Sequence, residues 1–364
     1  MIAAMVGVSL HRVCLLIVTI GVAGCAAAPP PPEPPRLVWP PPPAPPRIEF
    51  VQSLSSGEDL RSARSAGSWL LDLVGGSSPT VDRLAEPMGV AVSDDGNRVY
   101  VADHAQHAIF VFDLARRSVH RLGVEPIGRP VGLALDGEER VWVVEQVRRG
   151  VGLFARDGRR LAFIGHPTLE RPVGLALDRA RRRLYVADAG TLQSAEHTVK
   201  IFDWDGRLVG AIGRDKGDGP GQFLFPTYVA VDANGRVYVS DTLNARVQVF
   251  DPDGRHVATI GERGTAWGMF DTPKGVALDG FGNVYVVDSG WSNVQIFNQR
   301  RQVLLFFGGR GPLPGLLKNP TAIAIDRDNR IYVADYLNRR VEAYRLVNTT
   351  AEDSFLDPAA ARTR

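Results

Sequence analysis

Cysteine is nearly absent from this chain: its 364 residues include two, Cys14 and Cys25, both near the N-terminus. The rest of the sequence has no thiol, which excludes a disulfide framework and a thiol nucleophile there. A Cys-x-x-Cys-His sequence is also absent, so the chain has no attachment site for c-type haem. A chain of this length must therefore be stabilised by a large hydrophobic core.

Excess charge of one sign and catalytic sequence motifs are lacking too. Lys and Arg total 42 and Asp and Glu total 40, which gives a formal net charge of +2. Nucleic-acid binding usually requires a strongly basic surface, so we expect no nucleic-acid partner. The sequence contains no Gly-x-Ser-x-Gly elbow, and no motif places a serine beside a histidine and an aspartate. These absences disfavour nucleophilic catalysis.

A sixfold repeat is the dominant feature of the sequence. In each repeat a proline opens an apolar run that ends in an acidic residue 15 or 16 positions later. The six pairs are Pro87 and Asp103, Pro130 and Glu145, Pro172 and Asp188, Pro226 and Asp241, Pro273 and Asp288, and Pro320 and Asp335. Repeats of this length, built from short β-type runs, are typical of β-propeller blades.

Each repeat contains four runs that suit β-strands. Two apolar runs are separated by turn residues such as Asp232-Ala-Asn-Gly235, which favour a hairpin. A third run alternates in polarity and a fourth follows a second turn. The sequence therefore predicts an all-β, six-bladed propeller. Its blades are expected near residues 87–123, 130–165, 172–213, 226–261, 273–308 and 320–346.

The last repeat ends after its third strand, near Leu346. A ring closed there would leave an unpaired strand edge, which proteins avoid. Residues 47–54 have the length of the missing fourth strand, so we expect them to pair with the sixth blade and close a propeller that spans 47–347. Trp69–Val74 is a competing candidate, and residues 58–74 are otherwise expected to form a helix or a covering loop.

The fourth repeat resembles the NHL repeat, whose pattern includes Asp-Thr-x-Asn-x-Arg-Val-Gln-Val-Phe. Residues 226–250 match the pattern nearly throughout, and the sixth repeat keeps Asp335-Tyr-Leu-Asn-Arg-Arg-Val. The resemblance covers roughly residues 47–347 and implies a six-bladed NHL propeller. NHL propellers include binding scaffolds, RNA-binding modules and metal-dependent lyases, so the resemblance leaves the function open.

Residues 1–24 resemble a bacterial lipoprotein signal peptide. A short basic start precedes the apolar stretch 13–22, and Val-Ala-Gly stands directly before Cys25. This stretch is too short for a transmembrane helix, which needs about 20 residues. The resemblance implies export, lipidation of Cys25 and a location in the cell envelope. The residue after the cysteine is Ala26 and not an aspartate, which favours the outer membrane if the host has one.

Residues 25–46 are expected to be the lipidated cysteine and an extended linker. Twelve prolines lie between residues 29 and 46. At ~3.1 Å per residue, a polyproline II segment of this length would hold the propeller roughly 50 Å from the membrane. The tail 348–364 lacks hydrophobic periodicity and is expected to be disordered.

One face of the predicted ring carries the longer loops, and we call it the loop face. It comprises the loops between second and third strands and the loops that connect blades, of which 214–225, 262–272 and 308–319 are long. Arginine and tryptophan dominate binding hot spots, and loops on rigid scaffolds commonly carry function. The candidate contact residues are Arg148, Arg149, Arg246, Trp267, Trp291, Arg339 and Arg340.

The six acidic residues that end the second strands, here called the blade-end acids, admit two interpretations. In the structural one, each carboxylate accepts backbone hydrogen bonds, and an arginine five residues later neutralises Asp241 (Arg246) and Asp335 (Arg340). The other blade-end acids lack that arginine. Three of them lie near histidines and could bind a divalent cation: Asp103, Glu145 and Asp188, with His104, His107 and His197.

The leading hypothesis is a monomeric, membrane-tethered propeller that binds a protein partner in the cell envelope, with no catalytic activity and no cofactor. The second hypothesis is an enzyme with its site in the central funnel, either a metal-dependent lyase or a lactone hydrolase. A third is a glycan-binding module that uses aromatic side chains as stacking surfaces.

Overall fold

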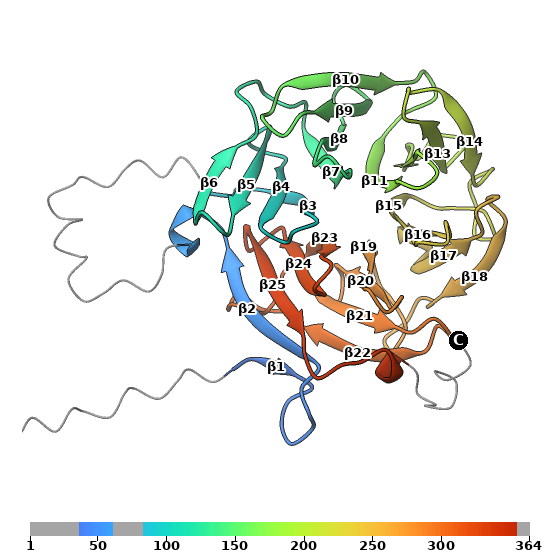
Figure 1. Cartoon of the computed structure of the whole chain (residues 1–364). Coiled ribbons are helices and arrows are strands. Elements are labelled where there is room, and N and C mark those ends of the chain that lie inside the picture. Colours follow the sequence, from blue (N-terminus) through green and yellow to red (C-terminus); the bar gives the residue numbers. More distant parts are fainter. Residues whose placement is uncertain (1–35, 61–82, 355–364) are drawn as a thin grey trace, which may run out of the picture. The chain divides into compact units, whose positions relative to one another are not determined.

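The computed structural model describes residues 36–60 and 83–354, which form six antiparallel sheets arranged in a ring (Figure 1). The predicted six-bladed β-propeller is confirmed. The first strands of the blades contact each other in ring order around the centre. Within these described residues, no helix has the length and apolar character needed to cross a membrane. The predicted signal peptide 1–24, Cys25 and the alternative closing strand Trp69–Val74 lie outside the described residues.

The first three blades each have four strands. Blade one comprises β3 (Pro87–Val92), β4 (Arg98–Asp103), β5 (Ala108–Asp113) and β6 (Ser118–Arg121). Blade two comprises β7 (Pro130–Leu135), β8 (Val141–Glu145), β9 (Gly150–Phe154) and β10 (Arg160–Gly165). Blade three comprises β11 (Pro172–Asp178), β12 (Arg183–Asp188), β13 (Thr198–Asp203) and β14 (Leu208–Ile212).

The other three blades follow the same order. Blade four comprises β15 (Pro226–Val231), β16 (Val237–Asp241), β17 (Arg246–Phe250) and β18 (His256–Ile260), with a short 3-10 helix η2 (Thr242–Asn244). Blade five comprises β19 (Pro273–Leu278), β20 (Val284–Asp288), β21 (Asn293–Phe297) and β22 (Val303–Gly308). Blade six contains β23 (Pro320–Ile325), β24 (Arg330–Asp335) and β25 (Arg340–Leu346).

Close approach of the innermost strands explains their small residues. A Cβ added at Gly132 would lie 2.6 Å from the carbonyl oxygen of Val173 and 2.9 Å from Gly174 Cα in the next blade. The hydrophobic core lies between neighbouring sheets, as where Tyr100 and Ile109 of blade one pack with Leu133 of blade two. The ring is thus held by six apolar interfaces whose inner ends admit almost no side chain.

Strand β2 (Ile48–Leu54) closes the ring by pairing antiparallel with β25, as predicted from the missing strand. Its end residues, Ile48 and Leu54, are fully buried. A further strand, β1 (Val38–Trp39), pairs with β2, so blade six has five strands in the order β1-β2-β25-β24-β23. The hydrogen-bond edge of β25 is therefore covered by the N-terminal part of the described chain.

Residues 36–46 differ from the extended linker expected for 25–46. The Trp39 ring packs edge-on against Tyr344 with centroids 5.7 Å apart, and it lies 6.1 Å from Phe307 of blade five. Proline content alone predicts an extended segment, but a tryptophan that reaches the core gives this one enough buried apolar area to dock. The part of the predicted linker that precedes Arg36 lies outside the described residues.

The start of the tail also differs from the disorder expected for 348–364. Residues 348–354 run back to the closing strand and include a 3-10 helix, η3 (Glu352–Ser354). Arg47 forms an ion pair with Asp353 at 3.0 Å, and its side chain also donates to the Asn348 carbonyl. The described ends of the chain therefore meet at blade six. Helix η1 (Gly57–Leu60) begins the segment 58–74, and the rest of that segment is not described.

Removing the closing strand should destabilise the whole ring. A chain that begins at residue 47 lacks β1 alone, whereas one that begins at residue 56 also lacks β2 and exposes the edge of β25. Loss of the buried Ile48 and Leu54 side chains costs roughly 4 kcal/mol or more. We therefore expect the melting temperature of the shorter chain to fall by about 10 °C or more in calorimetry. Equal melting of this chain and the full chain would contradict the closure.

Candidate functional site

All six blade-end acids are buried and make the same backbone contact. Each carboxylate accepts a hydrogen bond from the backbone N–H of the residue 17 positions earlier, at 2.7–3.3 Å. The donor and acceptor pairs are Glu86 and Asp103, Gly128 and Glu145, Arg171 and Asp188, Leu224 and Asp241, Asp271 and Asp288, and Lys318 and Asp335. These contacts support the structural interpretation, since each acid fixes the loop that leads into its own blade.

The arginine partners agree with expectation in blade four and differ in blade six. Arg246 Nε lies 2.8 Å from Asp241 Oδ2, as predicted. In blade six Arg340 Nε instead lies 2.5 Å from Glu342, two residues further along β25. The predicted pair of Arg340 with Asp335 is therefore replaced, because an alternative carboxylate stands closer to the guanidinium.

Glu145 of blade two is also neutralised, contrary to the expectation that it lacks a cation. Arg160 on β10 reaches across β9, and its Nη1 lies 2.5 Å from Glu145 Oε1. Gly152 makes room for this contact, since a Cβ there would lie 2.2 Å from Glu145 Oε1 and 2.8 Å from Arg160 Nη1. The glycine is the sequence signal that could have identified this pair.

The predicted metal set does not assemble among the described residues. No three histidine, cysteine, aspartate or glutamate side chains in residues 36–60 and 83–354 are grouped so that they could hold a metal ion. His197 is buried with both ring nitrogens in use: Nδ1 accepts from the Phe225 N–H at 3.0 Å, and Nε2 donates to the Thr191 carbonyl at 3.0 Å. It is a structural histidine that anchors the loop 189–197.

The two other histidines of that set also face the backbone. His107 Nδ1 accepts a hydrogen bond from the backbone N–H of Arg129 at 3.4 Å. Burial lowers the pKa of His104, against a backbone hydrogen bond to Pro130 that raises it, and its Nδ1 is buried without a partner among the described residues. Both histidines thus connect blade one with the loop or first strand of blade two.

The centre of the ring is crossed by one side chain. Tyr228 stands on β15, where other blades carry glycine or alanine, and its hydroxyl donates to the Met88 carbonyl on β3 at 2.7 Å. Strands β3 and β15 are opposite each other in the ring order. Tyr228 packs with Val131 and Val173, and burial raises the pKa of its phenol. The half-buried side chain thus spans the centre of the ring and occupies space that a funnel site would need.

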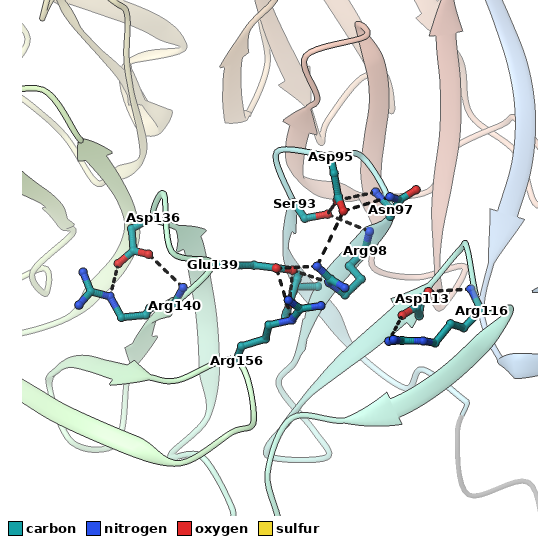
Figure 2. Close-up of polar contacts among 11 residues, drawn as sticks. Ser93, Asp95, Asn97, Arg98, Asp113, Arg116, Asp136, Glu139, Arg140 and Arg156 are labelled. Carbon is teal, nitrogen blue, oxygen red and sulfur yellow. Dashed lines mark hydrogen bonds and ion pairs between the residues drawn. The ribbon is translucent and has the colours of Figure 1, made fainter.

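Ion pairs join the hairpin turns on the opposite face of the ring. Asp94 of blade one pairs with Arg179 of blade three at 2.7 Å and with Arg327 of blade six at 3.0 Å. Figure 2 shows a second group, in which Arg98 and Arg156 flank Glu139 between blades one and two. These contacts join the hairpin turns of different blades on this face.

The candidate contact residues are distributed over four blades on the loop face. Arg148 and Arg149 are exposed in blade two, and Arg339 is exposed in blade six. Arg246 and Arg340 are half-buried, and their guanidinium groups donate to loop carbonyls, so neither presents a free charge.

Trp267 and Trp291 are brought together at blade five. They are 70% and 41% exposed, and both line a pocket of about 290 Å³. Phe306 on β22 completes its aromatic wall and is 39% exposed; its ring meets Trp267 edge-on at 5.0 Å. We call this the blade-five pocket. The sequence analysis did not identify Phe306, because the apolar run of β22 alone does not show which of its side chains face the loops.

Buried carboxyl groups near the closing strand have displaced pKa values. Burial raises the pKa of Glu342 to about 7 and that of Asp335 to about 6. Glu342 accepts a hydrogen bond from Ser53 on β2 at 2.6 Å, which acts in the opposite direction. The ionisation of these acids therefore makes the pairing of the closing strand sensitive to pH.

Comparison with known proteins supports an NHL-type propeller. Residues 223–250 match the NHL repeat, and residues 56–190 match the SMP-30/gluconolactonase/LRE-like region. A search among curated protein sequences found no match. Together with the six blades, the two family matches assign the repeat type and leave the activity to be argued from the site.

Solved structures share the fold at low sequence identity. A Bacteroides thetaiotaomicron protein of unknown function is 16% identical over 82% of this chain and 75% of that chain, with a TM-score of 0.59. Virginiamycin B lyase from Staphylococcus aureus is 14% identical over 74% and 87%, with a TM-score of 0.52. A Xanthomonas campestris gluconolactonase is 17% identical over 82% and 98%, with a TM-score of 0.56. At these identities the likeness shows the fold alone.

Substitution of Gly152 should break the Glu145–Arg160 pair. In Gly152→Ala the added methyl group overlaps both partners, so the buried carboxylate loses its nearer cation and keeps only Arg148 at 3.8 Å. We expect a loss of roughly 2 kcal/mol in the free energy of unfolding, measured with denaturant. Gly137→Ala is the matched control, because a Cβ there meets nothing within 4 Å. Equal stability of the two variants would contradict this role of Gly152.

Stability should depend on the ionisation of Glu342. Its folded pKa, about 7, lies above the ordinary value of 4.5, so its contribution is full below pH 4.5 and is lost as pH rises through 7. In Glu342→Gln this dependence disappears. We expect the stability of the variant relative to wild type to rise by up to about 3 kcal/mol between pH 4.5 and 8. A constant difference across this range would refute the assignment.

Proposed function

We propose that this chain is a lipid-anchored propeller that binds a protein partner in the bacterial cell envelope and catalyses no reaction. The observation that carries this proposal is Tyr228, which spans the centre of the ring. Propeller enzymes of the kind considered above need a funnel open to substrate. Here part of that space is taken by a half-buried side chain whose hydroxyl is already hydrogen-bonded.

The state of the polar groups supports the same proposal. The blade-end acids and His197 are engaged with backbone N–H groups, carbonyls or arginines, so they serve the scaffold. In contrast, Arg149 and Arg339 are exposed on the loop face, together with Trp267 and Trp291. Arg148 is exposed too, but it stacks on Phe163 and lies 3.8 Å from Glu145. A rigid ring that presents arginine and tryptophan on loops is suited to binding.

The membrane anchor rests on the sequence of residues 1–25. The described chain begins at Arg36 and passes directly into β1 and β2 at blade six. A tether on this side would join the propeller beside its closing seam and leave the loops of the other blades free for a partner. Lipidation of Cys25 and an outer-membrane location are part of this proposal.

A funnel-site enzyme is the second candidate. The match of residues 56–190 to the SMP-30/gluconolactonase/LRE-like region favours it, as does the likeness of the fold to a virginiamycin B lyase and a gluconolactonase. Its metal would depend on His104, His107 and His197. The backbone contacts of His107 and His197 count against it.

Affinity purification of the full chain from its own membranes tests the proposal. We expect a protein partner in fixed stoichiometry, whose binding can be rebuilt from the two purified proteins. We also expect no hydrolysis of gluconolactone and no heat of binding for Zn²⁺ or Ca²⁺. In Cys25→Ser the chain should leave the membrane fraction, because the acylated thiol is gone.

The enzyme candidate predicts the opposite outcome. Lactone hydrolysis that disappears, together with bound metal, on combined substitution of His104, His107 and His197 would overturn the binding proposal. Retention of Cys25→Ser in the membrane fraction would refute the anchor without touching the binding role.

A further inference from the structure

Three inter-blade loops share one design, which allows direct comparison of blades four, five and six. The loops run over residues 216–223, 263–270 and 310–317, and a parallel bridge joins the ends of each. Each loop packs on the third strand of its blade: Gly221 N–H donates to Gln248, Gly268 N–H to Gln295 and Gly315 N–H to Glu342. The three blades thus present the same surroundings at this place.

An arginine fills the space under the loop in two of these blades. Arg246 donates to the carbonyls of Gly219 and Gln222 at 2.9 and 3.0 Å. Arg340 donates to the carbonyls of Pro312, Leu313 and Leu316 at 2.7–3.1 Å. In both blades a guanidinium is therefore held by the loop and the third strand.

Blade five has Asn293 at the same register position. Asn293 lies opposite Asp288 in the strand register, as Arg246 lies opposite Asp241 and Arg340 lies opposite Asp335. The shorter side chain does not reach the loop carbonyls. Its Oδ1 is buried and has no hydrogen-bond partner among the described residues. The blade-five pocket, of about 290 Å³, lies at this position.

The pocket presents aromatic surface and hydrogen-bond acceptors, and its lining residues carry no charge. These residues are Thr265, Ala266, Trp267, Met269, Trp291, Asn293, Gln295, Phe306 and Gly309. Trp267 stands where the other two loops have Pro220 and Pro314. Gln295 accepts from the Gly268 N–H and donates to the Met269 carbonyl, so it holds the loop in place. The free acceptor is Asn293 Oδ1.

Blade two shows that this kind of surface takes a guanidinium. Phe163 and Phe306 occupy equivalent register positions, opposite Gly152 and Gln295. The Arg148 guanidinium carbon lies 4.1 Å from the Phe163 ring centroid, a cation–π contact. In blade five, Phe306 has no such cation over it among the described cation–π contacts.

The charge behind the pocket also favours a cation. Asp288 is fully buried directly behind Asn293 in the strand register. Backbone N–H groups of Asp271, Thr272, Gly290 and Trp291 hold it. No ion pair to Asp288 is seen in residues 36–60 and 83–354, whereas Asp241 has Arg246. Lys274 interacts electrostatically with Asp288, but no guanidinium stands beside this carboxylate as Arg246 stands beside Asp241.

We propose that the blade-five pocket binds an arginine side chain of the partner protein, which takes the place of the arginine missing from this blade. The guanidinium stacks between the aromatic side chains and donates to Asn293 Oδ1. The pocket is close to the lower end of the volumes of small-ligand sites, which suits one side chain. This inference rests on the proposed function and names the chemical group that the partner presents.

Titration of the full chain in detergent with acetyl-Gly-Arg-Gly-amide tests the pocket. Indole fluorescence or calorimetry follows binding, and the citrulline peptide is an uncharged control of the same shape. We expect the citrulline peptide to bind the wild-type chain at least about fivefold more weakly than the arginine peptide does. We expect the same loss when the arginine peptide binds the Trp267→Ala variant. Asn293→Arg should abolish peptide binding, because its own guanidinium fills the site as in blades four and six.

Val124→Arg is the matched control for Asn293→Arg, since it adds the same charge at a fully exposed position outside the pocket. We expect it to bind the arginine peptide like wild type, and thermal unfolding checks that both variants are folded. Equal binding of the arginine peptide by Asn293→Arg and wild type would overturn the inference. So would binding of diacetylchitobiose that Asn293→Arg removes while the arginine peptide fails to bind.

Partner purification separates this inference from the proposed function. Recovery of the partner by wild type but not by Asn293→Arg supports both. Recovery of the partner by both proteins refutes arginine binding in the pocket and leaves the binding role of the propeller intact. Failure of wild type to recover any partner refutes the proposed function, and the peptide titration then decides the pocket by itself.

Discussion

One hydrogen bond recurs in every blade, and the other features of the ring are arranged around it. The buried carboxylate at the end of the second strand accepts the N–H of the residue 17 positions earlier. It thereby fixes the loop that enters the blade, although that loop lies outside the strand ladder. A buried carboxylate without donors would be strongly unfavourable, so each blade must supply further partners.

The blades meet this requirement in different ways, and the differences determine the surface. Blade four uses Arg246, blade two uses Arg160 from its outermost strand, and blade five uses backbone N–H groups alone. Because backbone groups satisfy Asp288, position 293 is released from carrying an arginine. An asparagine there opens the pocket beside Trp267. A solution to a stability problem in the scaffold thus creates the most distinctive cavity of the loop face.

The fold was predictable because its signals are local and repeated. The proline-to-acid interval and the turn residues define each blade, and the missing strand after Leu346 indicated how the ring closes. The two-residue strand at Trp39 was not predictable, since surrounding prolines dominate that segment. Tyr228 is visible as a departure from the glycine pattern, but the sequence does not show that its side chain crosses the ring.

The site was less predictable because it depends on side chains from distant strands. Trp267 and Trp291 were identified by residue type and by the face that carries them. Their meeting at one pocket depends on Phe306, whose orientation follows from strand register. Likewise, the partner of Glu145 lies on the fourth strand of its blade, and a choice between Asp335 and Glu342 for Arg340 requires atomic positions. Sequence spacing alone identifies neither the partner of Glu145 nor the carboxylate that pairs with Arg340.

The order of β1 and β2 along the chain also has a mechanical consequence. Any pulling force applied at the N-terminal side of Arg36 reaches the two-residue strand β1 before the seven-residue strand β2. Detachment of Trp39 would lengthen the segment that precedes β2 while β2 still seals the ring. The outermost strand of blade six can therefore detach under load before the propeller itself opens.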